Sequence, residues 1–203
     1  MDWIVLLPAA AALAYQAMAI VASLLFHERR RVLYGRPPLS SLPAVSLLKP
    51  VRGVDDRLME ALKSHVAQDY PEFEILLGVR SKEDPAWPIL EKLAGDHGNG
   101  GAVRLIECPT EAANGKVGVL VDLAKEARHP VWLVNDADII VPPDYVRRVV
   151  AHLDRPDTGL VTCLYRAEAS SWAGRFEALV IATDFIPSTL VAPLVGVREF
   201  GLG

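Results

Sequence analysis

An uncharged stretch at the amino terminus constrains this chain more than any other feature of its sequence. No residue from Trp3 to Phe26 carries a formal charge. At about 1.5 Å per residue, a helix of this length crosses the roughly 30 Å hydrocarbon core of a bilayer. Ala17-Met18-Ala19 resembles a signal-peptide cleavage site, but the Met1-Asp2 start lacks a positive region and the apolar run continues past that site. We therefore predict an uncleaved membrane helix over residues 3–26.

Basic residues follow this helix directly. Residues 27–31 read HERRR, and Arg36 comes shortly after them. Positive charge flanks the cytoplasmic end of membrane helices, so we expect the amino terminus outside and the rest of the chain in the cytosol. Residues 27–43 read as a basic and Pro-rich linker, which would hold the following domain, residues 44–203, close to the membrane. The bilayer is therefore an expected partner.

The composition supports membrane contact and argues against other partners. Of the 203 residues, 51% are hydrophobic, and the mean hydropathy is +0.24, which is more apolar than a typical soluble domain. The net charge of −4 and the lack of a basic stretch interleaved with aromatic residues argue against nucleic acid. Cys108 and Cys163 lie far apart and outside any ligand spacing, so neither a disulfide framework nor a zinc site is indicated.

Strand and helix patterns alternate after the linker. Short apolar runs predict strands, and apolar residues at helical spacing, such as Leu58, Leu62 and Val66, predict the helices between them. This alternation is typical of an α/β domain with a mostly parallel sheet flanked by helices. The expected strands cover residues 45–49, 73–79, 103–106, 131–134 and 159–165, and the other expected helices cover residues 86–94, 116–127 and a segment opened by Pro142-Pro143-Asp144-Tyr145.

Two carboxylates follow the fourth of these strands. Asp136 and Asp138 come just after Val131–Val134, and side chains two apart on an extended backbone point the same way. Carboxylate oxygens at the carboxyl end of a buried strand suit Mg²⁺ or Mn²⁺, and open α/β sheets bind ligands at this edge. The pattern predicts a metal-bound phosphate or diphosphate, and an Asx turn that only caps the strand is the alternative.

The last part of the chain is strongly apolar. Residues 172–187 begin as an amphipathic helix, and Asp184 is the only acid between Leu179 and Val197. This stretch fits a core helix that other parts of the protein cover, and it also fits a surface that rests in the membrane interface.

Three motifs in order resemble the opening of the ceramide glucosyltransferase family. They are VSLLKPVRGVD at residues 45–55, QDYPEFEILLGV at residues 68–79 and EDPA at residues 83–86. The resemblance extends over about residues 40–203, and several ordered motifs are a stronger indication than one. It implies a GT-A type nucleotide-sugar-binding fold and a membrane-anchored, inverting enzyme of the glycosyltransferase family 21 type, similar to hopanoid-linked bacterial glycosyltransferases.

The resemblance also implies roles for single residues. Asp84 matches the family aspartate that contacts the uracil of the sugar nucleotide, although an Asp before Pro is also a common turn former. Lys116 matches a family lysine near the nucleotide phosphates, and a solvated helix start is its alternative. Gly115 replaces the Pro of the family's Asn-Pro-Lys segment, and Gly118-Val119 replaces two Asn.

Further matches lie at the ends of the first, second and fourth strands. Asp136 matches the second family aspartate, and Asp138 completes an Asp-x-Asp that some members lack. Lys49 and Pro50 end the first strand beside the same edge and are expected to shape the nucleotide pocket, with strand-end punctuation as the alternative. Val79-Arg80-Ser81 departs from the family's Val-Gln-Asp. The predicted nucleotide-sugar-binding residues are Lys49, Pro50, Asp84, Lys116 and Asp136, and the predicted metal ligands are Asp136 and Asp138.

The expected reaction needs a leaving-group site and a base. A divalent ion on Asp136 and Asp138 can neutralise charge as the diphosphate departs. A general base must take the proton of the acceptor hydroxyl, and the resemblance places that base and the acceptor motif beyond Gly203. Asp184 is a substitute candidate on the acceptor side. We expect the chain as given to bind UDP-sugar and metal without transferring sugar.

Three classes of function are compatible with these patterns. The favoured one is a hexosyltransferase that moves glucose or N-acetylglucosamine from a UDP-sugar to a membrane lipid such as ceramide or a hopanoid. A haloacid-dehalogenase-type phosphohydrolase also has an apolar strand before Asp-x-Asp, but Ile140 stands where Thr or Val is usual and three strand units precede the motif. The third is a non-catalytic, membrane-tethered nucleotide-binding fragment.

Overall fold

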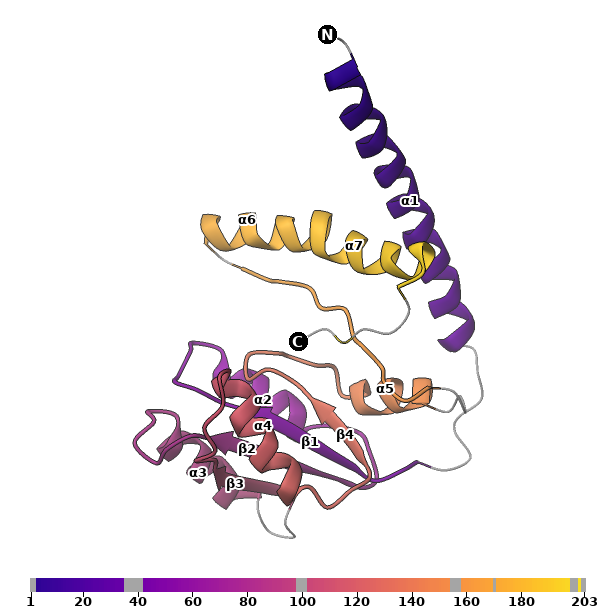
Figure 1. Cartoon of the computed structure of the whole chain (residues 1–203). Coiled ribbons are helices and arrows are strands. Elements are labelled where there is room, and N and C mark those ends of the chain that lie inside the picture. The colour runs from indigo at the N-terminus through magenta and orange to yellow at the C-terminus, as the bar shows by residue number, and fades with distance from the viewer. Residues whose placement is uncertain are drawn as a thin grey trace. The chain divides into compact units, whose positions relative to one another are not determined.

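Four parallel strands form the centre of one of two compact units (Figure 1). The computed structural model describes residues 3–34, 42–97, 102–153, 158–169, 171–197 and 201, without the side chains of residues 29–34. One unit spans Leu39–Thr158, and the other combines Met1–Pro38 with Gly159–Gly203. The first part of the linker predicted over residues 27–43 is helical and continues the first helix to Tyr34, and residues 35–41 lie outside the described residues.

The sheet has the strand order β3-β2-β1-β4, and every neighbouring pair is parallel. In its register, Leu47 lies opposite Ile75 on one side and Leu133 on the other. The strands begin and end within one residue of the first four predicted ones, so the alternating pattern predicted this sheet correctly. They are β1 (Val45–Pro50), β2 (Phe73–Val79), β3 (Val103–Glu107) and β4 (Val131–Val134).

Alternation along β1 and β2 divides the core between the two faces of the sheet. Leu47 and Ile75 pack in a cluster with residues of α2 (Leu58–Val66), α3 (Trp87–His97) and α5 (Tyr145–Leu153). Leu48 and Leu76 point to the other face and pack with α4 (Gly115–Glu126). Each of these four side chains is at most 1% exposed. The two central strands are therefore buried on both faces, as is usual for parallel sheets.

The helices of this unit confirm the helical predictions with small shifts at their ends. Residues 86–94 were expected to be helical, and α3 runs to His97, while α4 begins one residue before the predicted segment. The side chain of Asn114 accepts the backbone N–H of Lys116 at 2.9 Å and so caps α4. α5 begins at Tyr145, just after the two prolines that predicted its start.

Glycines allow α4 to approach its neighbours closely. A Cβ on Gly78 of β2 would lie 2.6 Å from Val119 Cγ1, and one on Gly118 of α4 would lie 2.3 Å from the carbonyl oxygen of Thr110. A backbone carbonyl cannot rotate away as a side chain can. Gly95 of α3 differs, because an added Cβ there meets no heavy atom within 4 Å.

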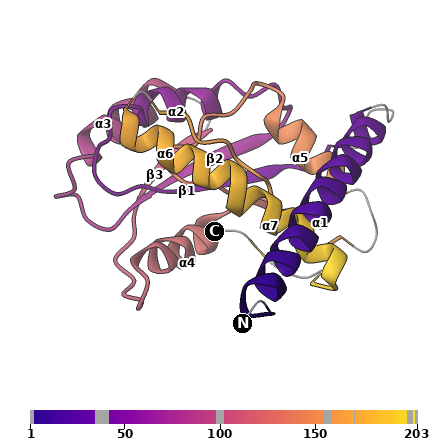
Figure 2. The same ribbon diagram turned by 90° about the horizontal axis from the view of Figure 1, so that it is seen from above.

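Two long helical runs dominate the other unit. The first is α1 (Trp3–Tyr34), and the second consists of α6 (Trp172–Val180), the π-helical turn η1 (Ile181–Phe185), α7 (Ile186–Val191) and the 3₁₀ turn η2 (Ala192–Val195). Figure 2 shows α7 crossing α1. Val191 of α7 packs there against Ala19 and Ala22 of α1, whose small side chains permit close approach. Trp3–Glu28 and Trp172–Val195 are both long and apolar enough to cross a membrane, judged by length and composition.

One prediction for this unit is wrong. The expected strand over residues 159–165 is absent, since residues 158–169 form neither helix nor strand. Leu160 is 66% exposed, so this stretch buries no regular apolar face that would favour pairing. The expected helix over residues 172–187 is present, but Trp172 is 82% exposed, and no described residue covers that end as a core would.

We expect Gly118→Ala to lower the free energy of unfolding by about 1–3 kcal/mol, because the added methyl group overlaps a fixed carbonyl group. Gly95→Ala is the matched control. The same change in open space should raise the free energy of unfolding by up to about 1 kcal/mol, since Ala favours a helix over Gly. Urea unfolding of the detergent-solubilised chain, followed by tryptophan fluorescence, measures both variants. Equal effects would contradict the close approach of α4.

Candidate functional site

The predicted site residues gather at the carboxyl edge of the sheet. The chain runs outward from β1 through β2 to β3 and then returns across β1 to form β4. Open α/β sheets bind ligands at such a switch point, outside the carboxyl ends of the strands. Lys49 and Pro50 end β1 at this edge, and the segment 135–138 follows β4.

The two aspartates of this segment are both exposed. Ala137 between them is partly buried against the core, so the chain alternates between inward and outward side chains here. The expected extended backbone is wrong in detail, because Ala137 and Asp138 form a turn in which the Ile139 N–H donates to the Asp136 carbonyl oxygen at 3.4 Å. The short segment after β4 lacks a neighbouring strand and closes on itself. Both carboxylates remain open to solvent on this turn.

Lys49 supports the turn from inside the sheet. Its side chain is 0% exposed, and Nζ donates to the Asp136 carbonyl oxygen at 2.8 Å. Strand alternation places Lys49 on the same face as Leu47, toward α2. Burial lowers the pKa of Lys49 to about 8, and the negative charges of Asp136 and Asp138 partly offset this effect.

His65 of α2 also lies beside the ammonium group of Lys49. Both nitrogens of its ring are 3.5 Å from Lys49 Nζ. Nδ1 lies 2.9 Å from the Ala61 carbonyl oxygen and must donate, whereas Nε2 lies 2.9 Å from Asn135 Nδ2 and must accept. Asn135 Oδ1 in turn accepts the hydroxyl of Tyr145 at 3.2 Å. Burial, and then the charge of Lys49, lower the pKa of His65 to about 4, so the ring is neutral at pH 7.

α2 also holds the chain that follows the aspartates. Ser64 Oγ accepts the backbone N–H of Val141 at 3.1 Å. The Gln68 side chain donates to the Pro142 carbonyl oxygen at 2.9 Å and accepts the N–H of Val146 at 3.0 Å. Ser64 of α2 and Gln68, two residues after the end of α2, therefore both bind the connection from β4 to α5.

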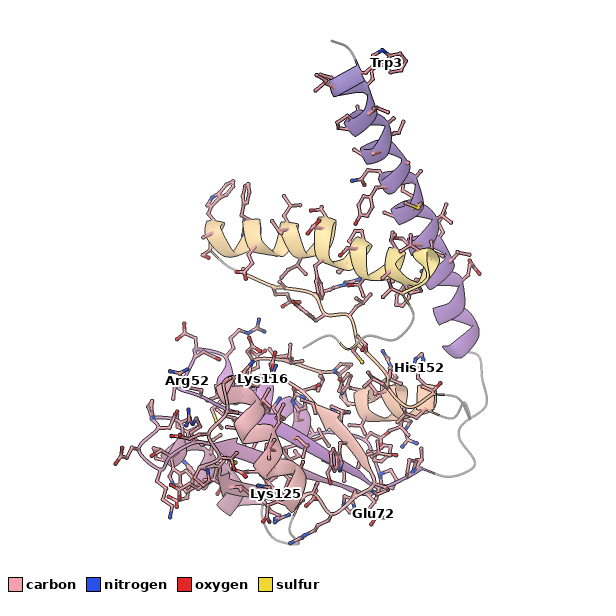
Figure 3. All side chains as sticks on the ribbon, viewed as in Figure 1. Trp3, Arg52, Glu72, Lys116, Lys125 and His152 are labelled. Atoms are coloured by element: carbon pink, nitrogen blue, oxygen red, sulfur yellow. The ribbon has the colours of Figure 1, made fainter. Side chains whose placement is uncertain are left out.

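Lys116 reaches Asp136 from the start of α4. Its Nζ lies 2.6 Å from Asp136 Oδ1, and the two side chains are 35% and 53% exposed. Such a pair contributes only about 0–1 kcal/mol, so the ammonium can exchange partners readily. Figure 3 shows Lys116 at the same end of the unit as Arg52. Arg80 adds a third cationic side chain, since its Nη1 would lie 3.7 Å from a Cβ on Gly115.

Asp84 holds the loop after β1. Its two carboxylate oxygens lie 3.0 and 3.2 Å from the backbone nitrogen of Gly53, and Oδ1 also accepts the N–H of Ala86 at 2.9 Å. Gly53 has a φ of +67°, in the left-handed region that favours glycine. The turn-forming role of Asp84 is thus present in the structure, and its contact with a nucleotide base stays a prediction.

The other predicted residues have different settings. Pro50 is partly buried at the end of β1. Asp184 belongs to the other unit, where it is exposed in η1.

Residues that the sequence patterns did not single out complete the cluster: His65, Asn135 and Tyr145. His65 is 0% exposed and takes the inward position that helical spacing assigned to Val66, which is only partly buried. A polar residue beside the apolar face of a predicted helix was the available indication. No sequence pattern connected His65 with Asn135, because the two lie on separate elements.

Asp136 and Asp138 are the described residues that fit a divalent cation. In the part of the chain that the structure describes, no three His, Cys, Asp or Glu side chains gather as metal ligands. Mg²⁺ sites on nucleotides commonly use one or two carboxylates and take their other ligands from phosphates and water. Two exposed carboxylates on one turn meet that need once Lys116 exchanges Asp136 for another anion.

The neutral state of His65 predicts an acid-sensitive fold. Its pKa falls from an ordinary 6.5 to about 4 on folding, so its stabilising contribution is complete above pH 6.5 and is lost as the pH falls toward 4. We expect this group to remove about 3 kcal/mol of the free energy of unfolding over that range. Urea unfolding at several pH values should show a flatter dependence for His65→Gln. The control His97→Gln, at the exposed end of α3, should keep the slope, and a slope unchanged in both variants would disprove the assignment.

Comparisons with known proteins match nearly the whole chain. The family model for glycosyl transferase family 21 matches residues 7–203. Ceramide glucosyltransferase 1 of Caenorhabditis elegans is 28% identical over 174 residues, which are 85% of this chain and 37% of that protein. A ceramide glucosyltransferase of Pyricularia oryzae is 39% identical over 83 residues, which are 36% of this chain and 17% of that protein. The chain therefore spans well under half of the length of these relatives.

A solved structure shares the arrangement of strands and helices. It is a mannosyltransferase from Pyrobaculum calidifontis in complex with GDP-Man and Mn²⁺, with a TM-score of 0.56 and 25% identity. The match covers 78% of this chain and 47% of that chain. Together with the parallel sheet, it confirms the expected GT-A type fold.

Proposed function

Because the chain belongs to glycosyl transferase family 21, we propose that its α/β unit binds a UDP-sugar through a divalent cation held by Asp136 and Asp138. One observation carries the proposal: the exposed carboxylate of Asp136 pairs with the ammonium of Lys116 at the carboxyl edge of a parallel sheet, two residues before the exposed Asp138. The family match over residues 7–203 favours a glycosyltransferase over the phosphohydrolase alternative.

Charge explains why this site needs a cation. Two carboxylates alone would repel a diphosphate. A Mg²⁺ or Mn²⁺ ion held by Asp136 and Asp138 would attract the carboxylates and the diphosphate alike. Lys116 would exchange Asp136 for a phosphate oxygen, because an ammonium on a flexible stem follows the nearest anion. The likeness to a mannosyltransferase whose structure contains GDP-Man and Mn²⁺ supports the use of a cation with a nucleotide sugar.

Each residue of the site would have a separate role in sugar transfer. A cation bound to Asp136 and Asp138 supplies Lewis-acid stabilisation of the leaving diphosphate. Lys116 places a second positive charge where negative charge develops. Asp84 fixes the loop after β1, which we assign to the uracil end of the donor. The acceptor oxygen attacks the sugar carbon opposite the leaving group, which inverts its configuration, and a general base takes the hydroxyl proton.

The proposed acceptor is a membrane lipid. Both relatives described above are ceramide glucosyltransferases, and α1 is apolar and long enough to anchor the chain in a bilayer. A transferase anchored in this way meets a lipid hydroxyl at the interface without extracting the lipid into water. Ceramide and a hopanoid are the candidate acceptors, and glucose and N-acetylglucosamine are the candidate sugars.

Isothermal titration calorimetry of UDP into the detergent-solubilised chain tests the donor site. We expect binding that requires Mn²⁺ or Mg²⁺ and that Asp136→Ala weakens at least about tenfold, which corresponds to about 1.4 kcal/mol. Asp96→Ala removes an exposed carboxylate from the end of α3 and is the matched control, with an expected change below about twofold. UDP binding that needs no cation and survives Asp136→Ala would contradict the proposal.

Cysteine labelling in cells tests the proposed cytosolic placement of the chain that follows α1. Cys163 is exposed, whereas Cys108 is buried and its pKa is raised to about 11 by burial, so Cys163 is the thiol that a maleimide modifies. We expect an impermeant maleimide to label Cys163 only after the cells are permeabilised. In a Cys163→Ser background, Asp2→Cys should be labelled in intact cells. The reverse pattern would place the amino terminus in the cytosol.

Lipid extracts of cells that express the full-length gene test the acceptor. We expect a new glycolipid whose mass identifies both the sugar and the lipid, because the enzyme and its acceptor share the membrane. Mass spectrometry of the same extracts should not find it when Asp136 is replaced by Ala. A lipid profile that is identical with and without the gene would contradict a lipid acceptor.

A further inference from the structure

We propose that Lys49 is a positioning residue that holds the turn of Asp136 and Asp138 in its cation-binding arrangement without touching the sugar nucleotide. This inference rests on the proposed function, since it assigns a role within the same cation and diphosphate site. It gives Lys49 a different task from Lys116, which lies partly exposed at the same edge.

Burial keeps Lys49 away from any ligand at the edge of the sheet. Its side chain is 0% exposed and points to the same face of the sheet as Val45 and Leu47. A sugar nucleotide outside the carboxyl ends of the strands would reach Nζ only if the core opened. Lys49 must therefore act through the groups that surround it.

The carbonyl group of Asp136 is the link between Lys49 and the site. Nζ donates to its oxygen at 2.8 Å, and the same oxygen accepts the Ile139 N–H at 3.4 Å. The second bond closes the turn that carries both aspartates. A charged donor makes a stronger hydrogen bond than a neutral one. Lys49 therefore fixes Asp136, the first residue of this turn, from the buried side of the sheet edge.

His65 directs Lys49 toward that carbonyl group. Its Nδ1–H donates to the Ala61 carbonyl oxygen and its Nε2 accepts from Asn135 Nδ2, each at 2.9 Å. Both ring nitrogens lie farther from Lys49 Nζ, at 3.5 Å. The bond to Asp136 is the shortest that the structure gives to Nζ. Because Asn135 directly precedes Asp136, the cluster holds two successive residues of the metal-binding segment.

The charge of Lys49 matters as well as its hydrogen bond. Asp136 and Asp138 repel one another when no cation lies between them, and a positive charge beneath the turn reduces that repulsion. The ammonium thus favours the close arrangement of carboxylates that a cation needs. An apolar side chain of similar length, such as Met, supplies neither the charge nor the donor.

The variant Lys49→Met tests the role in the full chain in detergent. We expect UDP binding in the presence of Mn²⁺ to weaken about 10- to 100-fold, the usual effect of removing a group that orients metal ligands. The electron paramagnetic resonance spectrum of bound Mn²⁺ should broaden, because the aspartates become less ordered. Circular dichroism shows whether the variant remains folded.

Two matched variants separate positioning from general effects. Leu90→Ala truncates a fully buried side chain of α3 and controls for lost stability, and Lys125→Met removes an exposed lysine of α4 and controls for lost charge. Both should bind UDP within about twofold of the unaltered chain. If Leu90→Ala weakens binding as much as Lys49→Met does, stability explains the effect and the positioning role is wrong.

The outcomes distinguish this role from the function on which it rests. If the unaltered chain binds no UDP with Mn²⁺, the proposed function falls and the positioning role falls with it. If the unaltered chain and Lys49→Met bind equally well, only the positioning role falls. Should Lys49→Met not fold, the unaltered chain is labelled with ¹⁵N-lysine. A shift of the Lys49 ammonium signal on addition of Mg²⁺ and UDP then supports the role, and an unmoved signal overturns it.

Discussion

A buried ammonium group that needs an acceptor shapes the carboxyl edge of this sheet. Lys49 follows Leu47 and Leu48 in a central strand and is as completely buried as they are. A charge removed from water is costly unless it finds hydrogen-bond partners. The carbonyl oxygen of Asp136, just beyond the neighbouring strand β4, meets that need at 2.8 Å. The bond crosses the place where the strand order reverses, and so it ties the two strands of the switch point together at their ends.

Rigid support and exchangeable contacts occupy different layers of this site. His65 of α2 and Gln68, two residues after the end of α2, bind the connection after β4 from the buried side, and Asp84 ties the loop after β1 to the start of α3. The outer layer consists of Asp136 and Lys116, which are partly exposed and paired with each other. Sites of this kind work best when supporting residues are locked and only the reacting groups change partners.

The other unit exposes long apolar stretches. Its helices carry long apolar stretches with little burial, and α7 packs on α1 through small alanine side chains. In water such surfaces would be costly, whereas a bilayer accepts them. Trp3–Glu28 and Trp172–Val195 are both long and apolar enough to cross a membrane, whereas the α/β unit carries exposed charges at the edge of its sheet.

The sequence by itself determined the features that depend on neighbouring residues. Apolar periodicity predicted the four strands that form and the helices between them, because it follows from local backbone geometry. The sequence also predicted two carboxylates just after the fourth strand, although they lie on a turn and not on an extended backbone. Tertiary structure alone decided the rest. Residues 159–165 have a strand-like composition but form no strand in the structure, and His65 is buried because Lys49 of β1 and Asn135, just after β4, lie against it. Strand pairing and side-chain burial depend on contacts with segments that are distant in the sequence, and a local sequence pattern does not contain those contacts.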